Sequence, residues 1–326
     1  MIPSNGSDVT SEYPLVRMWA STVCFLIMAF FNLIINWTIV CEERLRCHAR
    51  FVLVFHLLFS ALVYFGVCFA FHLQIYVRAS LVPTACRAVV TLLITSASNI
   101  LLTLTAMALD RYYAVCFPLK YSGKCSWHWP WLTGLLTWGL AAIIPLALPM
   151  DNNNNKFCDR EQLKKGSVHK VVLISVCFVV ILFSYMRILQ ESRRLGVLNF
   201  GNSVGCRTIA LHGTQLAVYL LPNFVNFLLQ RLEKSGQLGN ETRELCSVVV
   251  FAFFSLAQCI APIVYGLRKE ELLEDLQRHF PGLTCNVTAL LKWMVQWTCP
   301  RMPSHPRERA LTAQRLISQE LSQTSV

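Results

Sequence analysis

The sequence predicts an all-α protein, a seven-transmembrane helix bundle followed by a short amphipathic helix. Two observations lead to this prediction. Only 14% of the 326 residues are Asp, Glu, Lys or Arg and 55% are hydrophobic, whereas a soluble domain normally carries about 25% charged residues. The chain also contains seven long stretches without any charged side chain. They are residues 18–41, 51–77, 88–109, 125–150, 171–186, 208–230 and 245–267.

The stretches have the lengths that membrane-spanning helices need. A helix requires about 20 apolar residues to cross roughly 30 Å of hydrocarbon at 1.5 Å per residue. Six stretches contain 22 to 27 residues, whereas the fifth contains 16. We therefore expect the fifth span to include the stems of Lys170 and Arg187, with their charged ends reaching the interface. Barrel strands alternate polar and apolar residues, so these continuous runs favour helices.

The charges predict the domain organisation and the orientation. We assign residues 1–17 to an extracellular tail, 18–268 to the bundle, 269–281 to an amphipathic interfacial helix and 282–326 to a cytoplasmic tail. With the N-terminus outside, the inner loops carry ten Lys or Arg and the outer segments eleven, which does not decide the orientation. Eight more follow the last span and favour a cytoplasmic C-terminus. The net charge of +11 is spread over loops and tails, which excludes a folded nucleic-acid-binding domain.

Two glycosylation sequons agree with a multi-pass protein of the cell membrane in this orientation. They begin at Asn5 and Asn240, and both fall on the outer side. We expect both asparagines to be glycosylated.

The third span ends in a distinctive motif. Residues 107–121 read MALDRYYAVCFPLKY, and Cys86 lies 25 residues before Arg111. This segment resembles the MAxDRYxAICxPLxY stretch of odorant receptors, within the rhodopsin-like class of G-protein-coupled receptors. The ending of the seventh span, residues 262–268, resembles the PxxYxLR ending of that family. Residues 207–212 and Ala261-Pro262 are most similar to the fish-type odorant-receptor-like branch, and the resemblance covers residues 18–280.

The resemblance implies an activation mechanism. Asp110 holds Arg111 in the resting state, and activation releases the guanidinium toward the C-terminal helix of a heterotrimeric G protein α subunit. The residues given a part in activation or coupling are Asp110, Arg111, Tyr112, Tyr185, Pro262 and Tyr265. Arrestin is a second implied inner partner, and Cys86 is implied to form a disulfide with Cys158 in the second outer loop. The other interpretation of Asp110 and Arg111 is that they only anchor the helix end at the interface.

Three departures from the family pattern have consequences. Ser60 and Ala61 stand where the family usually has Asp in span two, and Ala261 replaces the Asn before the span-seven proline. We therefore expect no modulation by sodium. Cys206 and Arg207 occupy the base of span six, where the family has an acidic partner for Arg111, so we expect a leaky resting state.

The resemblance also indicates the kind of ligand. Amine receptors carry Asp at the position of Leu93, and span seven lacks the lysine of opsins. We expect a small organic, odorant-like molecule bound mainly by hydrophobic contact. The candidate pocket residues are Leu93, Ile94, Ala97, Ser98, His169, Leu173, Asn223, Phe224, Phe227, Phe251 and Ser255. The alternative is that most of them only pack helix on helix.

The segment after the last span is predicted to lie on the inner leaflet. Leu272, Leu273, Leu276 and Phe280 recur at helical spacing with charges opposite, which is typical of a helix that contacts membrane lipid. Cys285 is a candidate for palmitoylation. The ending Thr324-Ser325-Val326 matches the motif that PDZ domains bind.

Other functions remain as alternatives. A receptor for a peptide or a lipid is the nearest one. A transporter would need charged residues within the spans, and none of the seven stretches has any. An enzyme would need paired acids or a Ser–His arrangement; His56, His72 and His212 are isolated, and we expect them to be hydrogen-bonded in the bundle. The sequence predicts no cofactor and no metal site, since no cysteine pair has zinc spacing.

Overall fold

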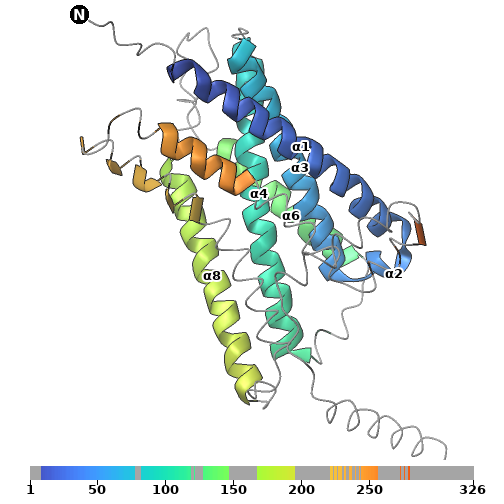
Figure 1. Cartoon of the computed structure of the whole chain (residues 1–326). Coiled ribbons are helices and arrows are strands. Elements are labelled where there is room, and N and C mark those ends of the chain that lie inside the picture. Colours follow the sequence, from blue (N-terminus) through green and yellow to red (C-terminus); the bar gives the residue numbers. More distant parts are fainter. Residues whose placement is uncertain are drawn as a thin grey trace, which may run out of the picture. The chain divides into compact units, whose positions relative to one another are not determined.

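In the computed structural model, every regular element of the described chain is a helix (Figure 1). The structure describes residues 9–77, 82–118, 121, 128–146, 167–194, 221–222, 224–225, 227–229, 231–232, 235–236, 239, 242, 244–255, 272, 275 and 278–279. All of them belong to one compact unit that ends at His279. The labelled helices are α1 (Val9–Cys41), α2 (Glu43–Arg46), α3 (Ala49–Val77), α4 (Pro83–Cys116), α6 (His128–Leu146) and α8 (Ser167–Arg194). A further apolar helix is Glu244–Ser255.

The helices follow the predicted spans. Spans one to five correspond to α1, α3, α4, α6 and α8, and Glu244–Ser255 begins span seven. The described residues of span six, from residue 221 onward, are helical. Four sections within the described residues are long and apolar enough to cross a membrane, namely Leu15–Cys41, Ala49–Val77, Pro83–Cys116 and Val171–Arg194. The last contains 24 residues, so span five is longer than its charge-free stretch.

α1 begins earlier than the charges suggest. It starts at Val9 and runs through residues that the sequence assigned to the outer tail. A tertiary contact accommodates the charge within this helix: Arg17 is buried and its guanidinium forms an ion pair of 3.2 Å with Glu244 at the start of the seventh-span helix. A charged residue near the end of a hydrophobic stretch therefore lies inside this helix.

α3 and α4 form the centre of the described bundle. α3 packs against α1, α4 and α6, and α4 packs against α3, α6 and α8. Within the most apolar window of each helix, 67% of α4 is buried inside the protein but only 22% of α8. The exposed apolar residues of α1 and α8 include Leu26, Leu33, Val179 and Phe183, as expected of helices that face lipid.

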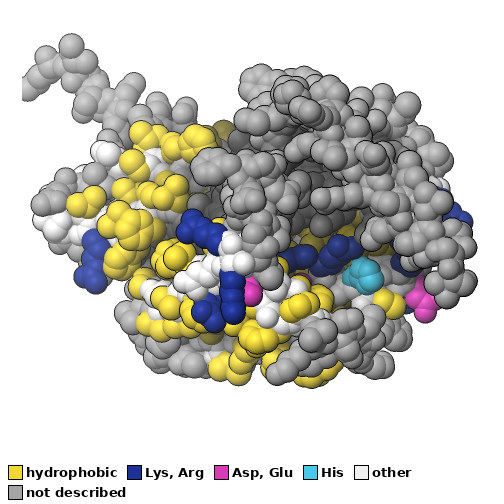
Figure 2. All heavy atoms as spheres, turned by 90° about the horizontal axis from the view of Figure 1, so that it is seen from below, with side chains coloured by type: hydrophobic (Ala, Val, Ile, Leu, Met, Phe, Trp, Pro, Cys, Tyr) yellow, Lys and Arg dark blue, Asp and Glu magenta, His cyan; other side chains and the backbone are white. Residues whose placement is uncertain are grey.

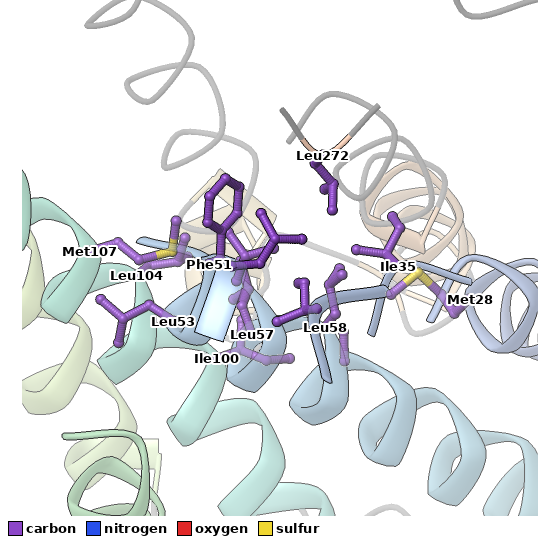
Figure 3. Packing of buried hydrophobic residues seen from close by; sticks show 14 of the residues in the cluster. Met28, Ile35, Phe51, Leu53, Leu57, Leu58, Ile100, Leu104, Met107 and Leu272 are labelled. Carbon is purple, nitrogen blue, oxygen red and sulfur yellow. The ribbon is translucent and has the colours of Figure 1, made fainter. Parts of the chain in front are cut away.

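A cluster of apolar side chains joins α1, α2, α3 and α4 with the segment after the last span (Figure 3). Met28 and Ile35 come from α1, and Leu58 comes from α3. The cluster also contains Leu272, which is only 1% exposed. Residues 272, 275 and 278–279 are helical. Leu272 therefore packs into the bundle core in addition to belonging to the predicted amphipathic face.

α3 and α6 approach each other closely at a glycine. A Cβ atom placed on Gly134 would overlap the imidazole ring of His56, so only glycine leaves room for this ring. Trp131 packs edge-on against the same imidazole, with ring centroids 5.6 Å apart. Small residues at helix contacts are typical of membrane proteins, where close packing replaces the hydrophobic effect as the driving force.

Polar side chains within the bundle are paired mainly with backbone of their own helix. Ser60 donates to the carbonyl of His56, at 2.6 Å, and Thr105 to that of Leu101. Between helices, the side-chain amide of Asn99 on α4 donates to the Ser60 hydroxyl at 2.6 Å. Such pairs let hydroxyl and amide groups exist where no bulk water reaches.

Candidate functional site

The C-terminal end of α4 holds the Asp110-Arg111-Tyr112 motif in a small polar network. The Tyr121 hydroxyl donates a hydrogen bond of 2.9 Å to one carboxylate oxygen of Asp110. The other oxygen lies 4.0 Å from Nε of Arg111. This ion pair is too long for a hydrogen bond. Asp110 is therefore bound more closely by the tyrosine than by the arginine beside it.

The burial of Tyr121, together with the charge of Asp110 and the hydrogen bond between them, raises the pKa of Tyr121 to about 12. The hydroxyl consequently keeps its proton at neutral pH and remains a donor. The sequence motif contained Tyr121 but gave no reason to assign it a role. The signal that could have found it is its place after Pro118, where the chain leaves α4 and can turn back toward it.

α8 lies against this end of α4. The rings of Tyr112 and Phe183 are 6.1 Å apart, and the sulfur of Cys116 is 4.0 Å from the carbonyl oxygen of Arg187. Arg111 is close enough to the half-buried Tyr185 to act on its hydroxyl electrostatically. The structure thus brings Asp110, Arg111 and Tyr112 together with Tyr185. Pro262 and Tyr265 lie outside the described residues.

Basic side chains are visible on the face that Figure 2 presents, where Lys and Arg lie among hydrophobic groups. Arginines of the described residues at the ends of α2 and α8 are Arg44, Arg46, Arg193 and Arg194. Positive charge at one end of a bundle is typical of a cytoplasmic face.

Two of the candidate pocket residues on α4 are packed into the bundle. Leu93 and Ile94 are buried in an apolar cluster with Cys68, Phe71, Cys86 and Val90. Ser98 is buried as well, whereas Ala97 is exposed. For Leu93 and Ile94 the observed contacts agree with helix-on-helix packing, which was the alternative to ligand contact.

The seventh-span helix places Phe251 against α3. Its ring meets the imidazole of His72 edge-on, with centroids 5.3 Å apart. Ser255 is 1% exposed, and its hydroxyl has no hydrogen-bond partner among the described residues. Leu173 and Phe227 are half-buried and Phe224 is exposed. Asn223 and the side chain of His169 lie outside what the structure describes.

Two histidines of α3, the buried His56 and the half-buried His72, differ from expectation. Neither ring nitrogen of His56, nor Nδ1 of His72, has a hydrogen-bond partner among the described residues. The expectation that both would be hydrogen-bonded in the bundle is therefore wrong for these three atoms. His56 is instead held by ring packing against Gly134 and Trp131. His212 lies outside the described residues.

Several other predicted sites lie outside the described residues, namely Asn5, Asn240, Cys158, Leu273, Leu276, Phe280, Cys285 and Val326. Cys86 itself is disulfide-bonded, and its pairing with Cys158 stays a prediction. Among the described residues, no group of three or more His, Cys, Asp or Glu could hold a metal ion.

Comparison with protein families matches residues 31–265 to the seven-transmembrane receptors of the rhodopsin family. This match covers more than half of the chain. The chain belongs to this family. Membership confirms the predicted all-α, seven-transmembrane fold, and it makes the chain a membrane receptor and not an enzyme.

The receptor also has distant relatives among proteins named for olfaction. It is 25% identical to odorant receptor 131-2 of Danio rerio over 198 residues, which are 54% of this chain and 59% of that one. It is 29% identical to olfactory receptor 4E1 of Homo sapiens over 197 residues, with the same two shares. Olfactory receptor 13D1 of Homo sapiens is 23% identical over 297 residues, or 82% of this receptor and 83% of its relative. The matched region thus spans about three-fifths of the first two relatives.

Proposed function

We propose that this receptor detects a small organic, odorant-like molecule on the outer side and activates a heterotrimeric G protein on the inner side. The observation that carries the proposal is the network of Asp110, Arg111 and Tyr121 at the end of α4. A guanidinium at a helix end has several N–H groups that need hydrogen-bond acceptors. It is therefore suited to bind carbonyl or carboxylate groups of a partner helix.

The orientation is part of the proposal. The N-terminus lies outside and the C-terminus in the cytoplasm, which puts the basic ends of α2 and α8 on the cytoplasmic side. The three relatives are named as odorant or olfactory receptors, which supports an odorant as the ligand.

Signalling in this account is a shift between two populations. In the resting state Asp110 attracts Arg111, and in the active state the guanidinium turns toward the G protein. The separation of 4.0 Å makes the attraction weak for a neighbouring pair. A ligand and a G protein that each favour the active state share the free energy of the shift, about 5.5 kcal/mol for a change from 1:99 to 99:1.

The test is second-messenger output in cells that express the receptor at measured surface levels, without any added ligand. We expect output above that of cells lacking the receptor, because the resting state is weakly held. Arg111→Ala should remove this excess, whereas Arg187→Ala, on the exposed side of α8, should keep most of it. Equal output with and without the receptor would contradict the leaky resting state, and an unchanged Arg111→Ala variant would contradict the role of the guanidinium.

A further inference from the structure

One face of the seventh-span helix is turned into the bundle along its described length. Glu244, Val248, Phe251 and Ser255 are spaced by four, three and four residues, so they lie in one row on a helix. Val248 and Ser255 are buried. The row reaches α1 through Glu244 and α3 through Phe251. The seventh-span helix thus contacts both α1 and α3, and residue 72 of α3 lies at this contact.

Charge at this end of the row is already neutralised. Arg17 is 5% exposed and its guanidinium is 3.2 Å from the Glu244 carboxylate. Phe251 lies seven residues after Glu244, which is about two turns or 10 Å along the helix. A charged ligand group would have to separate this pair in order to be neutralised by either member, so an uncharged ligand is favoured.

His72 carries an unsatisfied hydrogen-bonding atom in this apolar surrounding. Its Nδ1 is shielded from solvent and has no hydrogen-bond partner among the described residues. The ring is flanked by Phe71 and Phe251, with centroids 5.9 and 5.3 Å away. Leaving a buried polar atom unpaired destabilises the folded state, and a molecule that bonds to this atom removes that cost.

We propose that His72 is the polar anchor of the ligand site, and that it binds a neutral, mostly apolar molecule through an alcohol, aldehyde or ketone oxygen. This inference rests on the proposed function and names the ligand class. A neutral imidazole nitrogen accepts a hydrogen bond from a hydroxyl in one tautomer and donates one to a carbonyl in the other. The ring of Phe251, which meets the imidazole edge-on, provides apolar contact beside this oxygen.

The first test asks whether residue 72 can be reached from outside, and it needs no signalling. The receptor with Cys246→Ser serves as the parent for both cysteine variants. Cys246 is removed because it is a free, half-buried cysteine at the start of the seventh-span helix. His72→Cys and, as its matched control, Phe71→Cys are treated on intact cells with an uncharged reagent, 2-hydroxyethyl methanethiosulfonate. Phe71 is 2% exposed within the apolar cluster that joins α3 and α4.

We expect modification of the His72→Cys receptor above the parent and none of the Phe71→Cys receptor. Absence of modification at residue 72 would overturn the proposal, since a ligand could not reach it either. Equal modification at both positions would also overturn it, because the reagent would then reach this end of α3 from all sides and not through a site at residue 72.

The second test uses four probes with eight carbons: 1-octanol, octanal, 2-octanone and n-octane. We expect the receptor to respond to at least one of the three oxygen-containing probes. His72→Phe should raise the half-maximal concentration about tenfold, the value of one neutral hydrogen bond of about 1.4 kcal/mol, and His72→Gln should recover part of this loss. His56→Gln is the control, a buried histidine of the same helix that packs on α6.

Three results of the second test would overturn the assigned ligand class. One is an n-octane response as strong as that to the oxygen-containing probes. Another is an unchanged response in His72→Phe, which would leave water as the partner of Nδ1. The third is no response to any oxygen-containing probe. Basal output that depends on Arg111 reports the receptor function independently, so failure of this inference is distinguishable from failure of the proposed function.

Discussion

Gly134 of α6 packs directly against α3, and the ring of His56 occupies the space where a side chain would lie. We predict that Gly134→Ala lowers the stability of the folded bundle by about 1–3 kcal/mol, because the added methyl group must displace a packed ring. Thermal unfolding of the purified receptor in detergent measures the effect.

Gly139 provides the matched control on the same helix, since a Cβ placed there meets no atom within 4 Å. Gly139→Ala should be neutral or slightly stabilising, as alanine is the better helix former. Equal unfolding temperatures for the two variants would show that α3 and α6 do not pack at Gly134 as the structure has them.

The hydrogen bond from Tyr121 to Asp110 can be removed without changing any other side chain. Tyr121→Phe deletes the hydroxyl that donates to Asp110 and leaves the full carboxylate charge available to Arg111. We predict that basal signalling falls about threefold to tenfold, as expected when a bond of about 1 kcal/mol stops competing with the resting ion pair. The measurement is basal second-messenger output at matched surface expression.

Tyr113→Phe is the control for this variant, because Tyr113 is 53% exposed on the neighbouring position of α4. It should leave basal output unchanged. If Tyr121→Phe instead raised basal output, the hydroxyl would be part of the resting lock and the competition argued here would be wrong.

The sequence could name Asp110, Arg111 and Cys86 because they lie within a short motif or at a fixed spacing from it. It could not show that Tyr121 binds Asp110, since this depends on how the chain turns after Pro118. The contact of His56 with Gly134 was equally hidden, because 78 residues separate them and neither belongs to a motif.

Helices were easier to predict than their ends. A run without charges directly reflects what lipid requires, so α1, α3, α4, α6 and α8 were expected in order. The start of α1 was not, because Arg17 marks a span end when only its charge is considered. Its partner Glu244 lies 227 residues away and neutralises that charge inside the helix.

In the contact between α1 and the seventh-span helix, we predict that loss of Glu244 destabilises the receptor more than loss of Arg17. Glu244→Gln leaves the buried Arg17 guanidinium without its counter-charge, whereas Arg17→Gln leaves a Glu244 side chain that is 32% exposed and can be hydrated. We expect Glu244→Gln to cost about 1–3 kcal/mol of stability and Arg17→Gln less, because only the first leaves a buried charge unpaired.

Unfolding temperatures of both single variants and of the double variant measure this pair. The double variant should be more stable than the sum of the single losses implies, which is the signature of coupling. Losses that simply add would mean that the two side chains do not stabilise each other.

The receptor as a whole is expected to ignore sodium. A rhodopsin-family receptor with Asp in span two offers a charge to the ion, whereas here Ser60 is neutral and its hydroxyl is bonded to Asn99 and to the carbonyl of His56. Basal output should be the same in sodium and in N-methyl-glucamine at equal ionic strength. A clear loss of output specific to sodium would reveal an ion site elsewhere.

The account depends most on a chain that crosses the membrane seven times, with its two ends on opposite sides. Epitope tags at the N-terminus and at the C-terminus, stained in intact and in permeabilised cells, measure this directly. We predict that the N-terminal tag is stained in intact cells and the C-terminal tag only after permeabilisation. Staining of both tags in intact cells, or of both only after permeabilisation, would mean an even number of crossings and would contradict the receptor mechanism.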